Sequence, residues 1–141
     1  MKIFADTSGL FALLVKNDYM HIRAEKNFEY FAKNKIRLIT SSFVLVETIA
    51  LLQRRVSLEA VQDFYTRIYP LLEIIWVGED LYTRSIQRLI LSKTEDISLV
   101  DCLSFEIMEA QEITHAFTFD KHYEDQSFTI AAFHDLDDIT P

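Results

Sequence analysis

Residues that break helices and strands are scarce in this chain of 141 residues, which has two glycines and two prolines. Their scarcity predicts long regular elements joined by short connections. The sequence also lacks repeats, low-complexity segments and linkers. We therefore expect a single domain over residues 1–141, a length that allows a sizeable hydrophobic core.

Cysteine and long apolar runs are scarce as well. The lone Cys102 excludes an internal disulfide bond, which suits a reducing compartment. No apolar run reaches the ~18 residues that a membrane span requires, and the N-terminal residues do not resemble a signal peptide. We therefore expect a cytoplasmic protein that does not contact a membrane.

Positively charged residues are outnumbered by negatively charged ones. The chain has 14 Lys and Arg residues and 22 Asp and Glu residues, which gives a net charge of −8. This balance argues against a domain that holds nucleic acid by charge alone, since such affinity comes from neutralising phosphates with Lys and Arg. It allows a nuclease whose active site binds its own cations. An acidic excess is also common among soluble proteins, so the charge by itself does not choose a function.

Short apolar strand patterns alternate with longer helix patterns along the chain. The expected strands are Lys2–Ala5, Arg37–Thr40, Glu73–Val77, His115–Phe119 and Thr129–Phe133. The expected helices are Ser8–Val15, Tyr19–Lys35, Ser42–Arg55, one that begins at Ser57, Asp80–Ser92 and Ser98–Gln111. Strands separated by helices predict the α/β fold class, with a short parallel central sheet between helices in a three-layer α/β/α arrangement.

Two of these helices carry apolar faces that we assign to the core. The face of the second helix is expected to contain Ile22, Phe28, Phe31 and Ala32. The face of the helix that begins at Ser57 is expected to contain Val61, Phe64, Tyr65, Ile68 and Leu72.

Two aspartates directly follow expected strands. Asp6 comes after the first strand, and Asp120 comes after the strand "HAFTF". Ligands of open α/β sheets bind at the carboxyl ends of the strands, so these two carboxylates would meet at one edge. Each aspartate is alternatively a helix N-cap, because Asp is among the best capping residues.

Glu47 lies among apolar residues in "SSFVLVETIALL". Its helical neighbours one turn away are Phe43, Val44, Ala50 and Leu51. A buried carboxylate without a partner costs several kcal/mol, and no Lys or Arg lies within one turn of Glu47. The pattern therefore predicts a functional carboxylate; alternatively, Glu47 marks the solvent side of a helix that is apolar all round.

Asp101 follows Ser98 at the spacing of a helix capping box. Glu or Gln is the usual partner in that motif, because Asp is one methylene short for the return hydrogen bond. Asp101 also lies beside apolar residues, among them Phe105. Ser98 therefore serves as a helix cap, as a neighbour of a functional site, or as both.

Four carboxylates that converge need a counter-charge, because two unit charges about 4 Å apart repel by roughly 4 kcal/mol at an effective dielectric of 20. A divalent cation with oxygen ligands, Mg²⁺ or Mn²⁺, would remove this repulsion. Zinc fits less well, since Cys102 has no thiol partner. The histidines also lack zinc-like spacing, at positions His21, His115, His122 and His134.

Four segments together resemble a PIN domain, the fold of many small metal-dependent ribonucleases, including the toxins of VapBC-type toxin–antitoxin pairs. The segments are "FADTSGLFALL", "SSFVLVETIALL", "ISLVDCLSFEIM" and "AFTFDKHY". The resemblance implies an acidic catalytic and metal-binding site made of Asp6, Glu47, Asp101 and Asp120. It implies that Ser8 and Thr118 support this site, as Ser98 would by its position. A further acidic residue of the last motif would be Glu124 or Asp125.

The resemblance implies a Mg²⁺- or Mn²⁺-dependent endoribonuclease that hydrolyses RNA phosphodiester bonds, with a cognate antitoxin as partner. It also favours a homodimer, in which the Phe64–Leu72 face would be an interface. The alternatives are a stand-alone PIN nuclease in RNA processing, with DNA as a further substrate, and an inactive PIN-like binding module. A phosphatase that is phosphorylated on Asp6 is disfavoured, because its signature requires a second Asp where this chain has Ser8.

Overall fold

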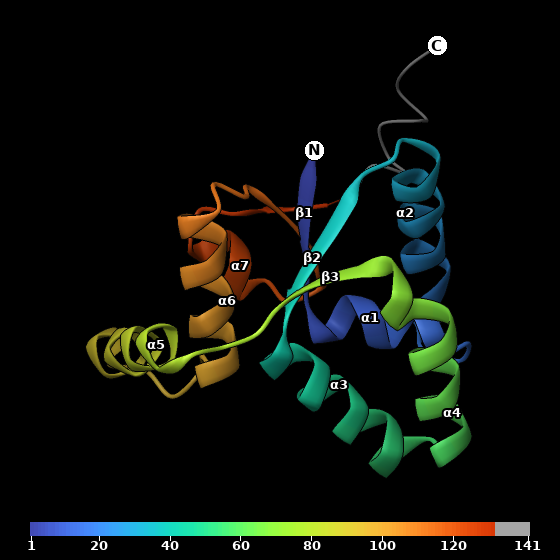
Figure 1. Cartoon of the computed structure of the whole chain (residues 1–141), viewed down its shortest axis with the longest axis horizontal. Coiled ribbons are helices and arrows are strands. Elements are labelled where there is room, and N and C mark those ends of the chain that lie inside the picture. The colour runs from blue at the N-terminus through green and yellow to red at the C-terminus, as the bar shows by residue number, and fades with distance from the viewer. Residues whose placement is uncertain (132–141) are drawn as a thin grey trace.

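Five parallel strands form the centre of the molecule in a computed structural model that describes residues 1–131 (Figure 1). Their order across the sheet is β3-β2-β1-β4-β5. The strands are β1 (Lys2–Ala5), β2 (Arg37–Ser41), β3 (Leu72–Ile75), β4 (His115–Phe117) and β5 (Thr129–Ile130). The apolar residues Ile3, Phe4 and Ala5 of the central strand β1 are fully buried, as expected for a parallel strand covered on both faces.

Helices cover both faces of this sheet. They are α1 (Thr7–Leu14), α2 (His21–Lys33), α3 (Ser42–Arg55), α4 (Leu58–Asp63), α5 (Glu79–Ser92), α6 (Leu99–Ala110) and α7 (His122–Asp125). A π-helical turn (Phe64–Ile68) and a 3₁₀ turn (Tyr69–Leu71) continue the chain from α4 to β3. Figure 1 shows α5, α6 and α7 on one side of the sheet and α1, α2 and α4 on the other. The predicted three-layer α/β fold is therefore confirmed.

Close packing of α1 against β4 fixes the edge of the sheet where β1 and β4 end. A Cβ atom at Gly9 would collide with the backbone carbonyl of Phe117, so only glycine allows this approach. The rings of Phe31 and Phe117 also pack edge to face, with centroids 5.4 Å apart, which ties β4 to α2. The start of α1 is thus held directly beside the end of β4.

The strand predicted at His115–Phe119 ends two residues earlier than expected. After Phe117 the backbone donates its hydrogen bonds to side chains instead of a neighbouring strand: Phe119 N–H to Ser8 Oγ and Asp120 N–H to Thr118 Oγ1. The short helix α7 then follows, which was not predicted from the sequence. The last expected strand is observed only over Thr129–Ile130, and its final two residues and His134 lie outside the described residues.

The predicted buried face of α2 is partly wrong. Phe31 is buried, but Ile22 is 69% exposed and Ala32 is exposed, whereas Ala24 and Asn27 are buried. The polar Asn27 is accepted in the interior because its Nδ2 donates a hydrogen bond to the carbonyl of Ala131, 3.2 Å away. The side of α2 that faces the core is thus set by a long-range hydrogen bond as well as by its apolar pattern.

The apolar face that precedes β3 is confirmed as core at three positions. Phe64, Ile68 and Leu72 are buried, whereas Tyr65 is 60% exposed and stacks on Tyr69 with ring centroids 5.0 Å apart.

Within residues 1–131, no helix has the length and apolar character to cross a membrane.

Candidate acidic active site

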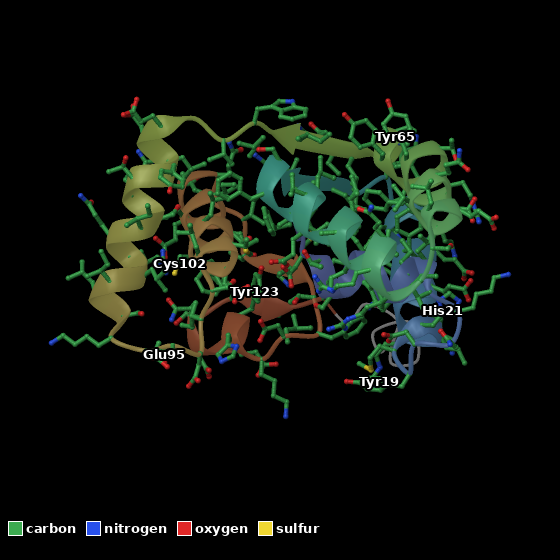
Figure 2. All side chains as sticks on the ribbon, turned by 90° about the horizontal axis from the view of Figure 1, so that it is seen from below. Tyr19, His21, Tyr65, Glu95, Cys102 and Tyr123 are labelled. Carbon is green, nitrogen blue, oxygen red and sulfur yellow. The ribbon has the colours of Figure 1, made fainter. Side chains whose placement is uncertain are left out.

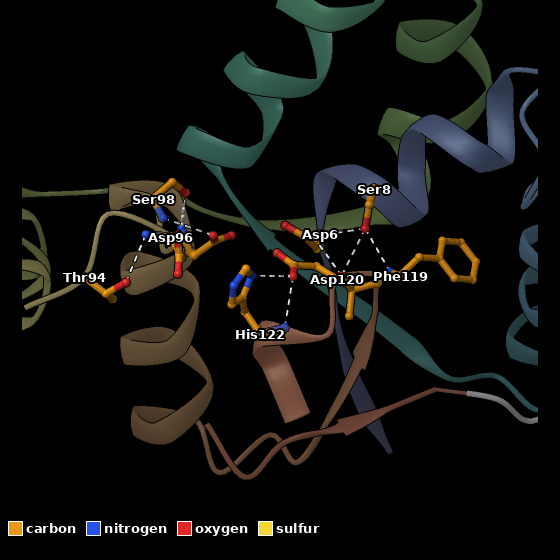
Figure 3. A network of polar contacts seen from close by, with 10 residues as sticks. Asp6, Ser8, Thr94, Asp96, Ser98, Phe119, Asp120 and His122 are labelled. Atoms are coloured by element: carbon orange, nitrogen blue, oxygen red, sulfur yellow. Dashed lines mark hydrogen bonds and ion pairs between the residues drawn. The ribbon is translucent and has the colours of Figure 1, made fainter. Parts of the chain in front are cut away.

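A hollow of about 440 Å³ opens where β1 and β4 end, beside α3 and the start of α6. All four carboxylates singled out in the sequence line it: Asp6, Glu47, Asp101 and Asp120. Ser8 and Ser98 line it as well, and Thr118 is buried beneath it, hydrogen-bonded to Asp6. Figure 3 shows Asp6, Ser8 and Asp120 close together, with Ser98 to their left at the start of α6. Residues more than one hundred positions apart therefore share one pocket.

Asp6 is held by two hydroxyl groups. Thr118 and Ser8 donate hydrogen bonds to its Oδ2, at 2.9 and 3.2 Å, and the residue is only 4% exposed. Although Asp6 occupies the N-cap position of α1, its side chain makes no capping hydrogen bond, so the capping alternative is wrong for this residue. Burial raises the pKa of Asp6, the Thr118 hydroxyl opposes that rise, and the charge of Asp120 adds to it.

Asp120 is aimed at the hollow by the turn that follows β4. Its Oδ1 accepts hydrogen bonds from the backbone N–H and the ring Nδ1 of His122, at 2.9 and 2.8 Å. Asp120 is not the N-cap of α7, which is Lys121, so the capping alternative is wrong here, although one of these bonds satisfies the first N–H of α7. The negative charge of Asp120 raises the pKa of His122, which stabilises the charged imidazolium.

Asp101 has a structural role and also lines the hollow. Ser98 Oγ accepts from the Asp101 backbone N–H at 3.0 Å, and the Asp101 carboxylate accepts from the Ser98 N–H at 3.2 Å, so the capping box is complete. The expectation that Asp is too short for the return bond is therefore wrong. Burial raises the pKa of Asp101 to about 6, and the charge of Asp6 contributes to this rise.

Glu47 lies at the boundary between core and solvent, and not on a fully buried face as predicted. Val44, one turn before it, is buried, but Ala50, one turn after it, is exposed. The next residue, Thr48, donates to Thr7 Oγ1 at 3.3 Å, which ties α3 to α1. Burial raises the pKa of Glu47, the neighbouring Thr7 side chain opposes the rise, and the charge of Asp6 adds to it.

The electrostatics of the hollow favour a hard cation that keeps part of its water. Mutual repulsion contributes to the raised pKa of Asp6, Glu47 and Asp101. In the described part of the chain, no three acidic, histidine or cysteine side chains are close enough together to enclose a metal ion. A cation held by one or two carboxylates and several waters is the usual arrangement for Mg²⁺, and it fits this donor set.

Several residues that shape the hollow were not predicted from the sequence. The loop before α2 contributes Asp18, Tyr19 and Met20, in a turn held by a 2.8 Å hydrogen bond from the Met20 N–H to Asp18 Oδ1. Asp18 is itself a local signal for this turn, because Asp side chains often accept from the backbone two residues on. The expected helix start at Tyr19 is two residues too early and places the helix over this turn.

Glu124 and Asp125 are exposed on α7, and neither lines this hollow.

Comparison with known proteins agrees with this fold. Residues 3–128 match the family model of the PIN domain. The chain belongs to the PIN-domain family. Among relatives of this PIN-domain chain is the 23S rRNA-specific endonuclease VapC20 of Mycobacterium tuberculosis, from strains CDC 1551 and H37Rv. It is 31% identical over 127 residues, which cover 89% of this chain and 95% of VapC20.

A crystal structure of Mycobacterium tuberculosis VapC20, described as a sarcin–ricin loop cleaving toxin, superposes on this PIN-domain chain with a TM-score of 0.80. The sequence identity over the superposed parts is 29%, and they cover 90% of this chain and 96% of VapC20. The likeness thus extends over nearly the whole of both proteins.

Proposed function

We propose that this PIN-domain protein is an endoribonuclease that hydrolyses RNA phosphodiester bonds, as the toxin of a VapBC-type toxin–antitoxin pair. The observation that carries the proposal is the convergence of Asp6, Glu47, Asp101 and Asp120 on one hollow. The likeness to VapC20, a 23S rRNA-specific endonuclease, over 89% of the chain supports RNA as the substrate class.

The roles that we assign to the carboxylates follow from their surroundings. Asp6 and Asp101 would hold Mg²⁺ or Mn²⁺, with Glu47 and Asp120 completing a second metal site or orienting the attacking water. When bound, the cation would lower the pKa of a water molecule and neutralise charge on the phosphoryl oxygens. The hydroxyls of Ser8 and Thr118 favour the ionised form of the Asp6 carboxylate, which is the form that binds a cation.

Basic residues flank the acidic hollow and would bind the phosphate groups of the RNA backbone. Arg55 lines the hollow itself. An adjoining hollow of about 540 Å³ shares Met20 and Phe119 with the first and is lined by the exposed Arg23 and Lys121, together with the acidic Glu124. Cationic side chains beside an aromatic ring are typical of single-stranded nucleic acid sites, in which phosphates meet the cations and a base stacks on the ring.

A cognate antitoxin and a second copy of the chain are the protein partners that we infer, in the cytoplasm. Exposed apolar side chains support an interface beside the edge strand β3: Tyr65, Leu71 and Trp76 are 60%, 56% and 70% exposed. Sedimentation analysis of the purified protein tests the homodimer. A monomer at all accessible concentrations would contradict it.

Cleavage of a short RNA hairpin with the sequence of the sarcin–ricin loop tests the proposed activity. We expect cleavage with Mg²⁺ or Mn²⁺ and none after EDTA, with a DNA hairpin of the same sequence as the substrate control. Equal cleavage with metal and with EDTA would refute metal dependence. A folded protein that cleaves no RNA under any condition would favour the inactive binding module.

A further inference from the structure

One buried hydroxyl group in the described part of the chain has no hydrogen-bond partner. Tyr123 is 0% exposed, and its Oη is the single buried side-chain polar atom of residues 1–131 that is left unpaired. Buried polar groups are nearly always hydrogen-bonded, because an unpaired one loses its water without compensation. This exception therefore requires a physical explanation.

The aromatic ring of Tyr123 is rigidly packed. It lies edge to face against Phe105, with centroids 4.9 Å apart, and it is tilted against Phe128 at 6.5 Å. Its backbone N–H donates to the Asp120 carbonyl at 3.3 Å, which ties it to the turn that carries the Asp120 side chain. Figure 2 shows Tyr123 in the middle of the molecule and Tyr65 at its edge. The hydroxyl therefore has a fixed place in the core.

The polar neighbours of this hydroxyl are the Asp6 carboxylate and the Ser104 hydroxyl, and both influence the pKa of Tyr123. Ser104 Oγ already donates its hydrogen to the carbonyl of Val100, at 2.9 Å, so it cannot also donate to Tyr123. A tyrosine hydroxyl carries its proton at neutral pH, so it can donate a hydrogen bond. A protonated phenol beside a carboxylate is a hydrogen-bond donor that faces an acceptor.

We propose that Tyr123 is a positioning residue, whose hydroxyl donates to Asp6 and orients that carboxylate when it binds a divalent cation. This inference rests on the metal site of the proposed function. Ser8 and Thr118 both donate to Asp6 Oδ2, and Tyr123 would add a third donor, carried by α7. Hydrogen bonds to a metal-binding carboxylate fix its direction, and their loss typically weakens metal affinity by 10–100-fold.

The Tyr123→Phe variant tests this role, because it removes one oxygen atom and keeps the packed ring. Its matched control is Tyr82→Phe, at an exposed tyrosine of α5 that does not line the hollow. Thermal unfolding of the full chain is followed in EDTA and over a series of Mg²⁺ concentrations. In EDTA we expect Tyr123→Phe to melt at or above the temperature of the parent, because the unpaired hydroxyl is gone.

With Mg²⁺, we expect the concentration that gives half of the thermal stabilisation to rise about tenfold in Tyr123→Phe and to stay unchanged in Tyr82→Phe. RNA cleavage by Tyr123→Phe should recover at high Mg²⁺, with an unchanged KM for RNA. A lower melting temperature in EDTA together with an unchanged Mg²⁺ midpoint would show a structural role and overturn this inference alone. A parent without any Mg²⁺ response would overturn the inference and the metal dependence of the proposed function together.

Discussion

The helices α1 and α6 both begin at the acidic hollow, and each brings one aspartate to it in a different way. At α6, Asp101 is bonded within its own first turn through the capping box with Ser98. At α1, Asp6 makes no capping bond and is held by Thr118, which is 112 positions away in the chain. One carboxylate is therefore fixed by local structure and the other by tertiary structure.

The two aspartates therefore differ in what they contribute to the stability of the fold. Asp101 stabilises its helix whether or not a cation is present, because a cap needs only an oxygen acceptor. Asp6 is buried at a cost, and its pKa is raised mainly by that burial. A residue that is unfavourable for folding and yet firmly held by two hydroxyls has the properties of a functional group.

The largest effect is expected from Asp6→Asn. Asparagine keeps an oxygen that can accept from Thr118 but removes the charge that a cation requires. We expect RNA cleavage to fall by at least about 100-fold, because electrostatic stabilisation by a bound metal contributes several kcal/mol. Circular dichroism should show an unchanged fold, and residual activity near that of the parent would remove Asp6 from the proposed site.

Asp101→Asn should reduce cleavage strongly while leaving the helix cap in place. The amide oxygen of Asn can still accept from the Ser98 N–H. In EDTA we expect the variant to be as stable at pH 7 as the parent or more stable, because repulsion from Asp6 is relieved. Mg²⁺ should then stabilise the parent more than the variant. A large drop in melting temperature in EDTA would show that the charge of Asp101 stabilises the metal-free protein and would contradict the repulsion from Asp6.

The stability of the metal-free protein should depend on pH through the same residue. The pKa of Asp101 is raised from 3.8 to about 6 in the folded protein. As the pH rises, the unfolded chain therefore loses the proton of the Asp101 carboxyl group at a lower pH than the folded protein does. The contribution of Asp101 to the free energy of unfolding is therefore full below pH 3.8 and declines between pH 3.8 and about 6. Urea unfolding in EDTA across this range should show a shallower decline for Asp101→Asn, and parallel curves would contradict the raised pKa.

The smallest effect is expected from Ser98→Ala, which removes the hydroxyl of the capping box and leaves all four carboxylates. Loss of an N-cap costs about 1 kcal/mol. We expect that decrease in the free energy of unfolding by urea, with RNA cleavage within a few-fold of the parent at saturating Mg²⁺. Cleavage reduced as far as in Asp101→Asn would show that the cap is needed to aim the carboxylate.

Local patterns were good guides to several elements of the fold. The strand β1 and the helix α3 were predicted at their observed residues, because both depend on short apolar patterns and local capping. The exposed side of α2 and the early end of β4 were not predicted. Both depend on hydrogen bonds to distant residues, from Asn27 to Ala131 and from Phe119 to Ser8.

The sequence by itself determined the alternation of strands and helices, the aspartates at the ends of elements, and the capping box of α6, because these features depend on neighbours within a few residues. Only the tertiary structure decided that Asp6 is held by hydroxyls, that Asp120 turns towards His122, and that the Tyr123 hydroxyl is buried without a partner. The physical reason is burial: a polar atom's cost and its partner depend on which distant segments exclude water from it, and no local pattern contains that information.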